Sequence, residues 1–130
     1  MQAIAHQPTR TVAGRVAYAM LAAALVVLIV LELARHGTGW WQLGVFGMGA
    51  DLALFAGMGR GLERGQLHPR AVLLYNALHR FYGAGALLVA AAAGLFGPAW
   101  LVAGLAWAFH VALDRALGYG LRTRDGFQRV

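Results

Sequence analysis

The chain has 130 residues, of which 60% are hydrophobic and only 12% are charged, whereas a soluble domain normally carries about 25% charged residues. It contains no cysteine and no serine, which excludes disulfides, thiolate metal sites and serine-hydrolase chemistry. The net charge is +6 without any lysine, and the arginines flank apolar runs, as in membrane orientation rather than nucleic-acid binding. We therefore expect one transmembrane domain, 1–130, whose partner is the lipid bilayer.

The first apolar run predicts a helix over about 14–35, which is long enough to cross a hydrocarbon core of about 20 residues. A cleaved signal peptide is the alternative, because Arg10 and Arg15 provide a basic start. The apolar run is longer than a signal core, however, and no small-x-small cleavage site follows it at Leu33-Ala34-Arg35-His36-Gly37. We expect a retained membrane helix.

Three further apolar runs predict helices over about 40–60, 70–95 and 98–119. The first of these begins with Trp40-Trp41, which is typical of an interfacial aromatic belt. Pro69 suits the first turn of the next helix, and Gly97-Pro98 forms a tight connection to the last one. The expected fold is therefore all-α, a four-helix transmembrane bundle.

The arginines predict the orientation of this bundle, because cytoplasmic ends carry an excess of basic residues. Only Arg35 lies on the side of the first and third connections. The opposite side carries Arg10, Arg15, Arg60, Arg64, Arg70, Arg122, Arg124 and Arg129. Both termini are therefore expected in the cytoplasm.

Two of the expected helices carry small residues at four-residue spacing, which allows close helix approach. These residues are Gly49, Ala53, Gly57 and Gly61 in one helix, and Gly104, Ala108, Ala112, Ala116 and Gly120 in the other. The stripes serve either contacts within the bundle or assembly into a homo-oligomer or a larger membrane complex.

Ionisable residues within the expected helices are the candidates for function, because such groups are costly in hydrocarbon. Asp51, His79 and His110 each lie nine residues from the cytoplasmic end of their helix, which corresponds to roughly 13 Å. Asn76 and Asp114 lie about one turn nearer the cytoplasm, on the same faces as the two histidines. This pattern predicts a polar chamber that opens towards the cytoplasm.

The residue types in this chamber favour a divalent metal site, with Zn²⁺, Fe²⁺ or Mn²⁺ as the ion. The three residues at equal depth would bind the metal, and Asp114 would act as a base or hold a ligand. Arg80 would hold a phosphate or carboxylate, and Asn76 completes the catalytic group. The hypothesis is a metal-dependent hydrolase of a lipid or another amphiphile.

Other interpretations of the same residues stay open. Asp51 and Asp114 can form buried ion pairs with Arg80 and Arg115 and serve structure alone. A chain of histidine, aspartate and arginine can also relay protons or bind an anion in a transporter. Two histidines can ligate a haem, although Asp51 at the same level disfavours this. A non-catalytic subunit of a membrane complex is a further alternative.

Two segments carry a resemblance to a known family. Tyr75-Asn76-Ala77-Leu78-His79 and His110-Val111-Ala112-Leu113-Asp114-Arg115-Ala116-Leu117-Gly118-Tyr119-Gly120-Leu121 resemble small bacterial integral membrane proteins catalogued as domain of unknown function 4260. The likeness extends to Asp51 and to Asp125-Gly126-Phe127, whereas Arg122 stands where family members often have lysine. The resemblance implies a four-helix membrane fold without an established activity, and with the charge pattern it indicates a multi-pass protein of the bacterial inner membrane.

Overall fold

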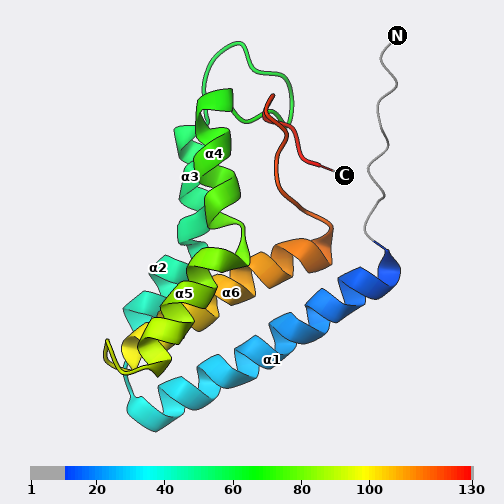
Figure 1. Cartoon of the computed structure of the whole chain (residues 1–130). Helices are drawn as coiled ribbons and strands as arrows, with labels where there is room; N and C mark the ends of the chain where they lie inside the picture. The colour runs from blue at the N-terminus through cyan, green and yellow to red at the C-terminus, as the bar shows by residue number, and fades with distance from the viewer. Residues whose placement is uncertain (1–10, 130) are drawn as a thin grey trace.

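The computed structural model describes residues 11–129, and these residues fold almost entirely into helices (Figure 1). The elements are α1 (Val12–His36), α2 (Trp40–Met48), the 3-10 helix η1 (Gly49–Asp51), α3 (Leu52–Ala56), α4 (Pro69–Leu78), α5 (Phe81–Ala92) and α6 (Ala99–Leu117). Among the described residues, the β pairing is a single antiparallel bridge between Arg122 and Gln128. The predicted all-α class is confirmed for this part of the chain. Arg10, one of the arginines used to predict the orientation, lies outside the described residues.

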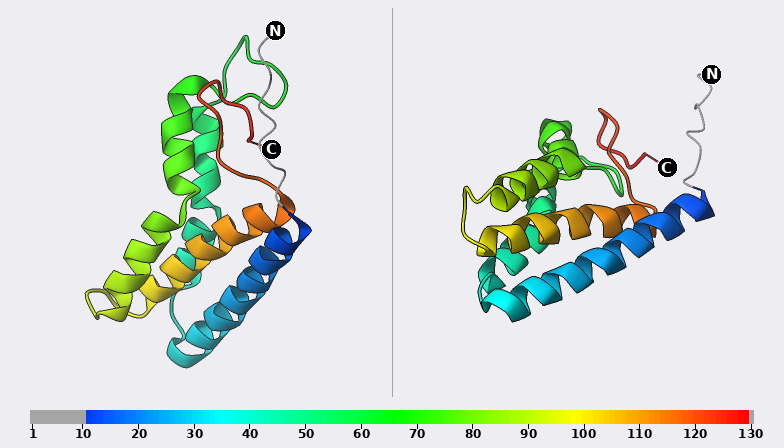
Figure 2. Two further views of the ribbon diagram at one scale, coloured as in Figure 1. Left: turned by 45° about the vertical axis from the view of Figure 1, so that its right-hand side comes forward. Right: turned by 60° about the horizontal axis from the view of Figure 1, so that its bottom comes forward.

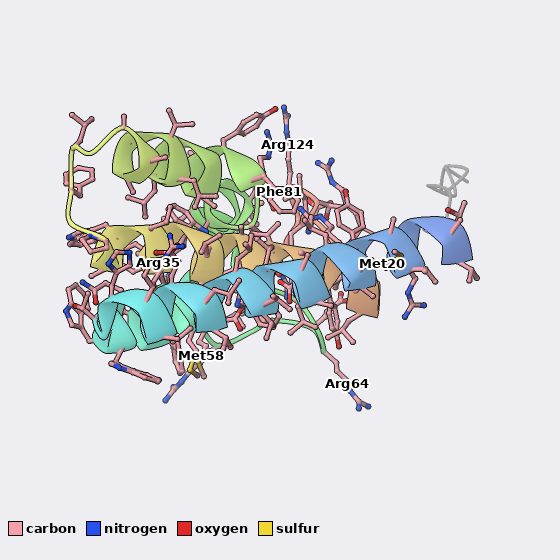
Figure 3. All side chains as sticks on the ribbon, turned by 90° about the horizontal axis from the view of Figure 1, so that it is seen from below. Met20, Arg35, Met58, Arg64, Phe81 and Arg124 are labelled. Carbon is pink, nitrogen blue, oxygen red and sulfur yellow. The ribbon has the colours of Figure 1, made fainter. Side chains whose placement is uncertain are left out.

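The helices form two groups. Helices α1, α2 and α5 each pack against α6, while α3 and α4 lie side by side and turn away from this layer (Figures 1 and 2). Helices α1 and α6 are antiparallel, and the Arg15 Nε donates a hydrogen bond of 2.9 Å to the Ala116 carbonyl where their ends meet. Figure 3 shows Arg35 at the other end of α1 and Arg64 projecting away from the helices.

Two helices, α1 and α6, are long and apolar enough to cross a membrane. Helix α1 begins at a Thr11 cap, whose hydroxyl accepts from the Gly14 N–H. It buries one stripe that includes Leu25 and Ile29 and leaves most of its other apolar side chains exposed, among them Met20 at 68%. A helix with apolar residues on the outside as well as the inside is typical of lipid contact.

The stretch predicted as one helix over about 40–60 is divided in the structure. Helix α2 ends at Met48, and the tight turn of η1 precedes α3, which ends at Ala56. Gly44, Gly47 and Gly49 lie in or beside the last part of α2, and glycine weakens a helix by up to about 1 kcal/mol each. The Gly47 carbonyl accepts a hydrogen bond from His110 Nδ1 at 2.8 Å.

The stretch predicted as one helix over about 70–95 is also divided, although it contains no proline after its first turn. Helix α4 ends at Leu78, and Arg80 is extended (φ −107°, ψ 156°) before α5 begins. Side chains of α6 donate to the carbonyls at this interruption. Trp107 Nε1 lies 2.8 Å from the Leu78 oxygen, and an Nη2 of Arg115 lies 2.6 Å from the His79 oxygen.

The small-residue stripes make contacts within the chain. A Cβ added to Gly104 would lie 2.8 Å from the Leu88 side chain of α5. Ala112 is fully buried in the core between α1 and α6, and Gly57 lies against Ala71 of α4. Assembly with other chains through the remaining positions stays a prediction.

Replacing Gly83 with alanine tests the packing that holds the second interruption. A Cβ at this position would collide with the Trp107 indole, so α5 or the indole must shift and weaken the Trp107–Leu78 hydrogen bond. We expect Gly83→Ala to cost about 1–3 kcal/mol of unfolding free energy, as overpacking usually does. Gly85→Ala in the same helix meets nothing within 4 Å and is the control.

Circular dichroism during thermal unfolding in detergent measures both variants. Equal midpoints for Gly83→Ala and Gly85→Ala would show that the close approach of α5 and α6 is not needed at this point.

Candidate metal centre

Four ionisable side chains meet where the two helices are interrupted. Asp51 is the last residue of η1, His79 follows the end of α4, and His110 and Asp114 lie one turn apart on α6. One oxygen or ring nitrogen from each of the four lies within 4.8 Å of the others, in an arrangement that could hold a metal ion. The structure thus brings together the three residues predicted at equal depth, and it adds Asp114 to the same group.

Five of the six distances within this cluster are nearly equal. His79 Nε2 lies 3.3 Å from Asp51 Oδ1 and 3.4 Å from Asp114 Oδ2. His110 Nε2 lies 3.3 and 3.5 Å from the same two oxygens, and 3.4 Å from the Nε2 of His79. Hydrogen bonds between charged partners are normally shorter, about 2.7–2.9 Å. Tetrahedral ligands placed about 2.1 Å from a common Zn²⁺ are about 3.4 Å apart, which matches these five separations, and the two carboxylate oxygens lie within 4.8 Å of each other.

In each of the two histidines, the hydrogen bond made by Nδ1 determines whether Nε2 presents a lone pair to the cluster. His79 Nδ1 lies 2.8 Å from the Tyr75 carbonyl oxygen, and His110 Nδ1 lies 2.8 Å from the Gly47 carbonyl oxygen. A carbonyl oxygen can only accept a hydrogen bond, so each Nδ1 carries a proton. In a neutral imidazole the Nε2 lone pair then faces the cluster, and this pattern is usual for histidines that bind metals.

The exposed fraction of the side chains increases from one side of the cluster to the other. The side chain of His79 is 0% exposed and that of His110 is 10% exposed, whereas Asp114 is 19% and Asp51 is 51% exposed. The imidazoles therefore form the closed side of the cluster, and Asp51 lies at its open side. Two carboxylates balance the charge of a divalent cation, which matters because unbalanced charge is costly in a buried site.

The two arginines named in the charge-pairing interpretation, Arg80 and Arg115, differ in burial. Both carboxylates face the two imidazoles. Arg115 is buried and donates to the His79 carbonyl, whereas Arg80 is exposed and precedes the first residue of α5.

The other two residues predicted as catalytic, Asn76 and Arg80, make contacts elsewhere. The Asn76 amide holds the backbone of Arg122, with Nδ2 donating to the carbonyl at 3.0 Å and Oδ1 accepting from the N–H at 2.7 Å. Arg80 lines an outer groove together with Tyr82 and Trp107.

Tyr75 lies beside the cluster. Its ring is stacked on the His79 imidazole with centroids 3.9 Å apart and planes at 15°. The four-residue spacing between the two residues places them on the same face of a helix.

Comparison with known proteins gives a family and no activity. Neither the curated proteins nor the solved structures include a significant match to this chain. A family model described as Domain of unknown function (DUF4260) matches residues 15–130. The match includes all four residues of the cluster and confirms the resemblance noted in the segments around His79 and His110. The chain therefore belongs to the family of domain of unknown function 4260.

Proposed function

We propose that this chain is an integral membrane protein that binds one divalent transition-metal ion and uses it to hydrolyse a lipid or another amphiphile. The observation that carries the proposal is the convergence of two imidazole nitrogens and two carboxylate oxygens, with five separations of 3.3–3.5 Å. Zn²⁺ suits this mixed nitrogen and oxygen set, and Fe²⁺ and Mn²⁺ share the preference.

The exposed apolar surface of α1 and the length of α6 support the membrane location. In our proposal the two interrupted stretches, 40–56 and 69–92, complete the membrane domain, with both termini in the cytoplasm of a bacterial cell. Interrupted helices are tolerated at membrane depth where protein or a cavity surrounds the irregular backbone. Here α6 provides that surrounding on one side of both interruptions.

The exposure of the carboxylates suggests their roles. A catalytic zinc site usually has three protein ligands and one position open to water. We assign His79, His110 and the more buried Asp114 as ligands and the half-exposed Asp51 as the general base for water. This exchanges the roles that the sequence suggested for the two aspartates. A bound metal ion would supply a water of lowered pKa and polarise the scissile carbonyl or phosphoryl group.

A second candidate function rests on the helix interruptions themselves. Several membrane transporters bind their coupling ion between discontinuous helices near the middle of the bilayer. Asp51 and His79 lie at the two interruptions, so the same cluster could pass a cation or protons through the protein. The two functions differ in whether the cluster acts on a substrate bond or releases its ion to the other side.

The first test is the metal content of protein purified in detergent. We expect about one zinc, iron or manganese ion per wild-type chain by mass spectrometry, and loss of this ion in His79→Ala and in His110→Ala. His36→Ala is the matched control, because His36 lies at the end of α1 and its side chain is 37% exposed. Equal metal content in all of these proteins would contradict the proposed site.

The second test separates the two aspartates. Asp51→Asn should keep the metal and lower hydrolysis of ester and phospholipid substrates by about 10²- to 10⁴-fold, as loss of a general base does. Asp114→Asn should lose the metal. Glu63→Gln, which changes an exposed acid in the loop before α4, is the control and should keep both properties.

Liposome measurements distinguish the second candidate. If the wild-type protein hydrolyses none of the substrates but conducts cations or protons, and Asp51→Asn abolishes the flux, passage replaces hydrolysis as the function. Full hydrolytic activity in Asp51→Asn would overturn the role assigned to this side chain.

A further inference from the structure

The segment after α6 returns across α4 and is firmly held there. Arg122 is 9% exposed, and its Nη1 donates to the carbonyls of Gly65 and Gly126 at 3.0 and 2.8 Å. The Leu67 N–H donates to the Gly126 carbonyl at 2.9 Å. Gly126 has a φ of 97°, and a Cβ at this residue would collide with the Leu67 backbone. The path of the segment is therefore fixed at several points.

This segment reaches the metal centre through one aromatic ring. The Arg122 guanidinium lies over the Tyr75 ring, 4.8 Å from its centroid, and the His79 imidazole is stacked on the same ring. The Gln128 Nε2 donates to the Tyr75 hydroxyl at 3.2 Å. The Tyr75 ring thus contacts the C-terminal segment and a candidate metal ligand at the same time.

Two contacts orient the His79 ring. The hydrogen bond from Nδ1 to the Tyr75 carbonyl fixes the tautomer and the direction of one ring atom. The flat Tyr75 ring stacked on the imidazole further restricts tilting about the Cβ–Cγ bond. Tyr75 is 3% exposed, and contacts from Arg122 and Gln128 hold its ring and hydroxyl. Loss of a group that orients a metal ligand typically lowers the metal affinity by about 10- to 100-fold.

We propose that Arg122 is a positioning residue of the metal centre, which acts through Tyr75 to fix the His79 ring. The C-terminal segment 119–129 then supports the metal centre. The inference rests on the proposed function, because it requires that the cluster binds a metal. It does not depend on whether the bound ion serves hydrolysis or passage.

The sign of the effect distinguishes positioning from simple electrostatics. Removing a positive charge near a bound cation should tighten metal binding, whereas losing the orientation of His79 should weaken it. Arg122→Lys keeps the charge but lacks the planar guanidinium that lies over the Tyr75 ring. A weaker site in both Arg122→Gln and Arg122→Lys therefore indicates positioning.

The experiment is a titration of the full-length protein in detergent with Co²⁺, whose visible absorption bands report ligand geometry. We expect Arg122→Gln and Tyr75→Leu to bind Co²⁺ about 10- to 100-fold more weakly than wild type, as loss of such supporting groups does. The absorption band of the residual complex should shift, which a loss of stability alone would not cause. Arg124→Gln, in the same segment but exposed, should match wild type.

The outcomes separate this inference from the proposed function. Wild-type protein that binds no Co²⁺ would overturn the metal centre and this inference with it. Wild-type binding together with unchanged or tighter binding in Arg122→Gln would keep the metal centre and overturn the role of Arg122. If Arg122→Gln does not fold, Tyr75→Leu decides, since it removes the stacked ring while leaving the arginine able to reach both carbonyls. An unchanged spectrum and affinity in Tyr75→Leu would overturn the proposal.

Discussion

A backbone carbonyl that loses its helical partner needs another donor, because an unpaired buried polar group costs about 1–3 kcal/mol. This protein interrupts two adjacent helices at the same level, and side chains of α6 donate to carbonyls at both interruptions. Trp107 and Arg115 donate to the carbonyls of Leu78 and His79, and His110 donates to that of Gly47. The interruptions are stable because an unbroken helix lies beside them.

The candidate metal centre follows from the same constraint. His110 uses its Nδ1 for the Gly47 carbonyl, so its Nε2 lone pair is left for the cluster. The end of α4 likewise places the Tyr75 carbonyl next to His79 Nδ1. The hydrogen bonds made by the two Nδ1 atoms therefore stabilise the backbone and set the tautomers of the ligands at the same time. A change that straightens either helix would remove a donor from the cluster as well as a hydrogen bond from the fold.

Much of this arrangement was predictable from residue counting. The all-α class, the apolar segments and the common level of Asp51, His79 and His110 follow from composition and a rise of about 1.5 Å per residue. The interruptions could not be predicted in the same way. The stretch around His79 lacks proline, and the donors that stabilise its break, Trp107 and Arg115, come from a helix about 30 residues later. Residue counting placed Asp114 in a separate layer because it assumed that the neighbouring helices are uninterrupted. Their interruptions bring Asp51 and His79 close to Asp114.

The C-terminal segment illustrates a second limit of the sequence. Asn76 lies one turn before His79, and its position on that face suggested a catalytic amide. In the structure this amide is satisfied by both backbone groups of Arg122. A polar residue near a site can thus hold a distant segment in place instead of meeting the substrate. Only the path of the chain after α6 decides between these roles, and that path depends on contacts such as Gly126 with Leu67.

The two carboxylates of the cluster need positive charge nearby to balance them. Protons could provide it by charging both imidazoles, whose Nε2 atoms lie 3.3–3.5 Å from oxygens of both carboxylates. Hydrogen bonds between such charged partners are normally about 2.7–2.9 Å long, which is shorter than these separations. A divalent cation between these side chains carries the same two charges, and it uses lone pairs that the backbone hydrogen bonds of His79 and His110 have already oriented.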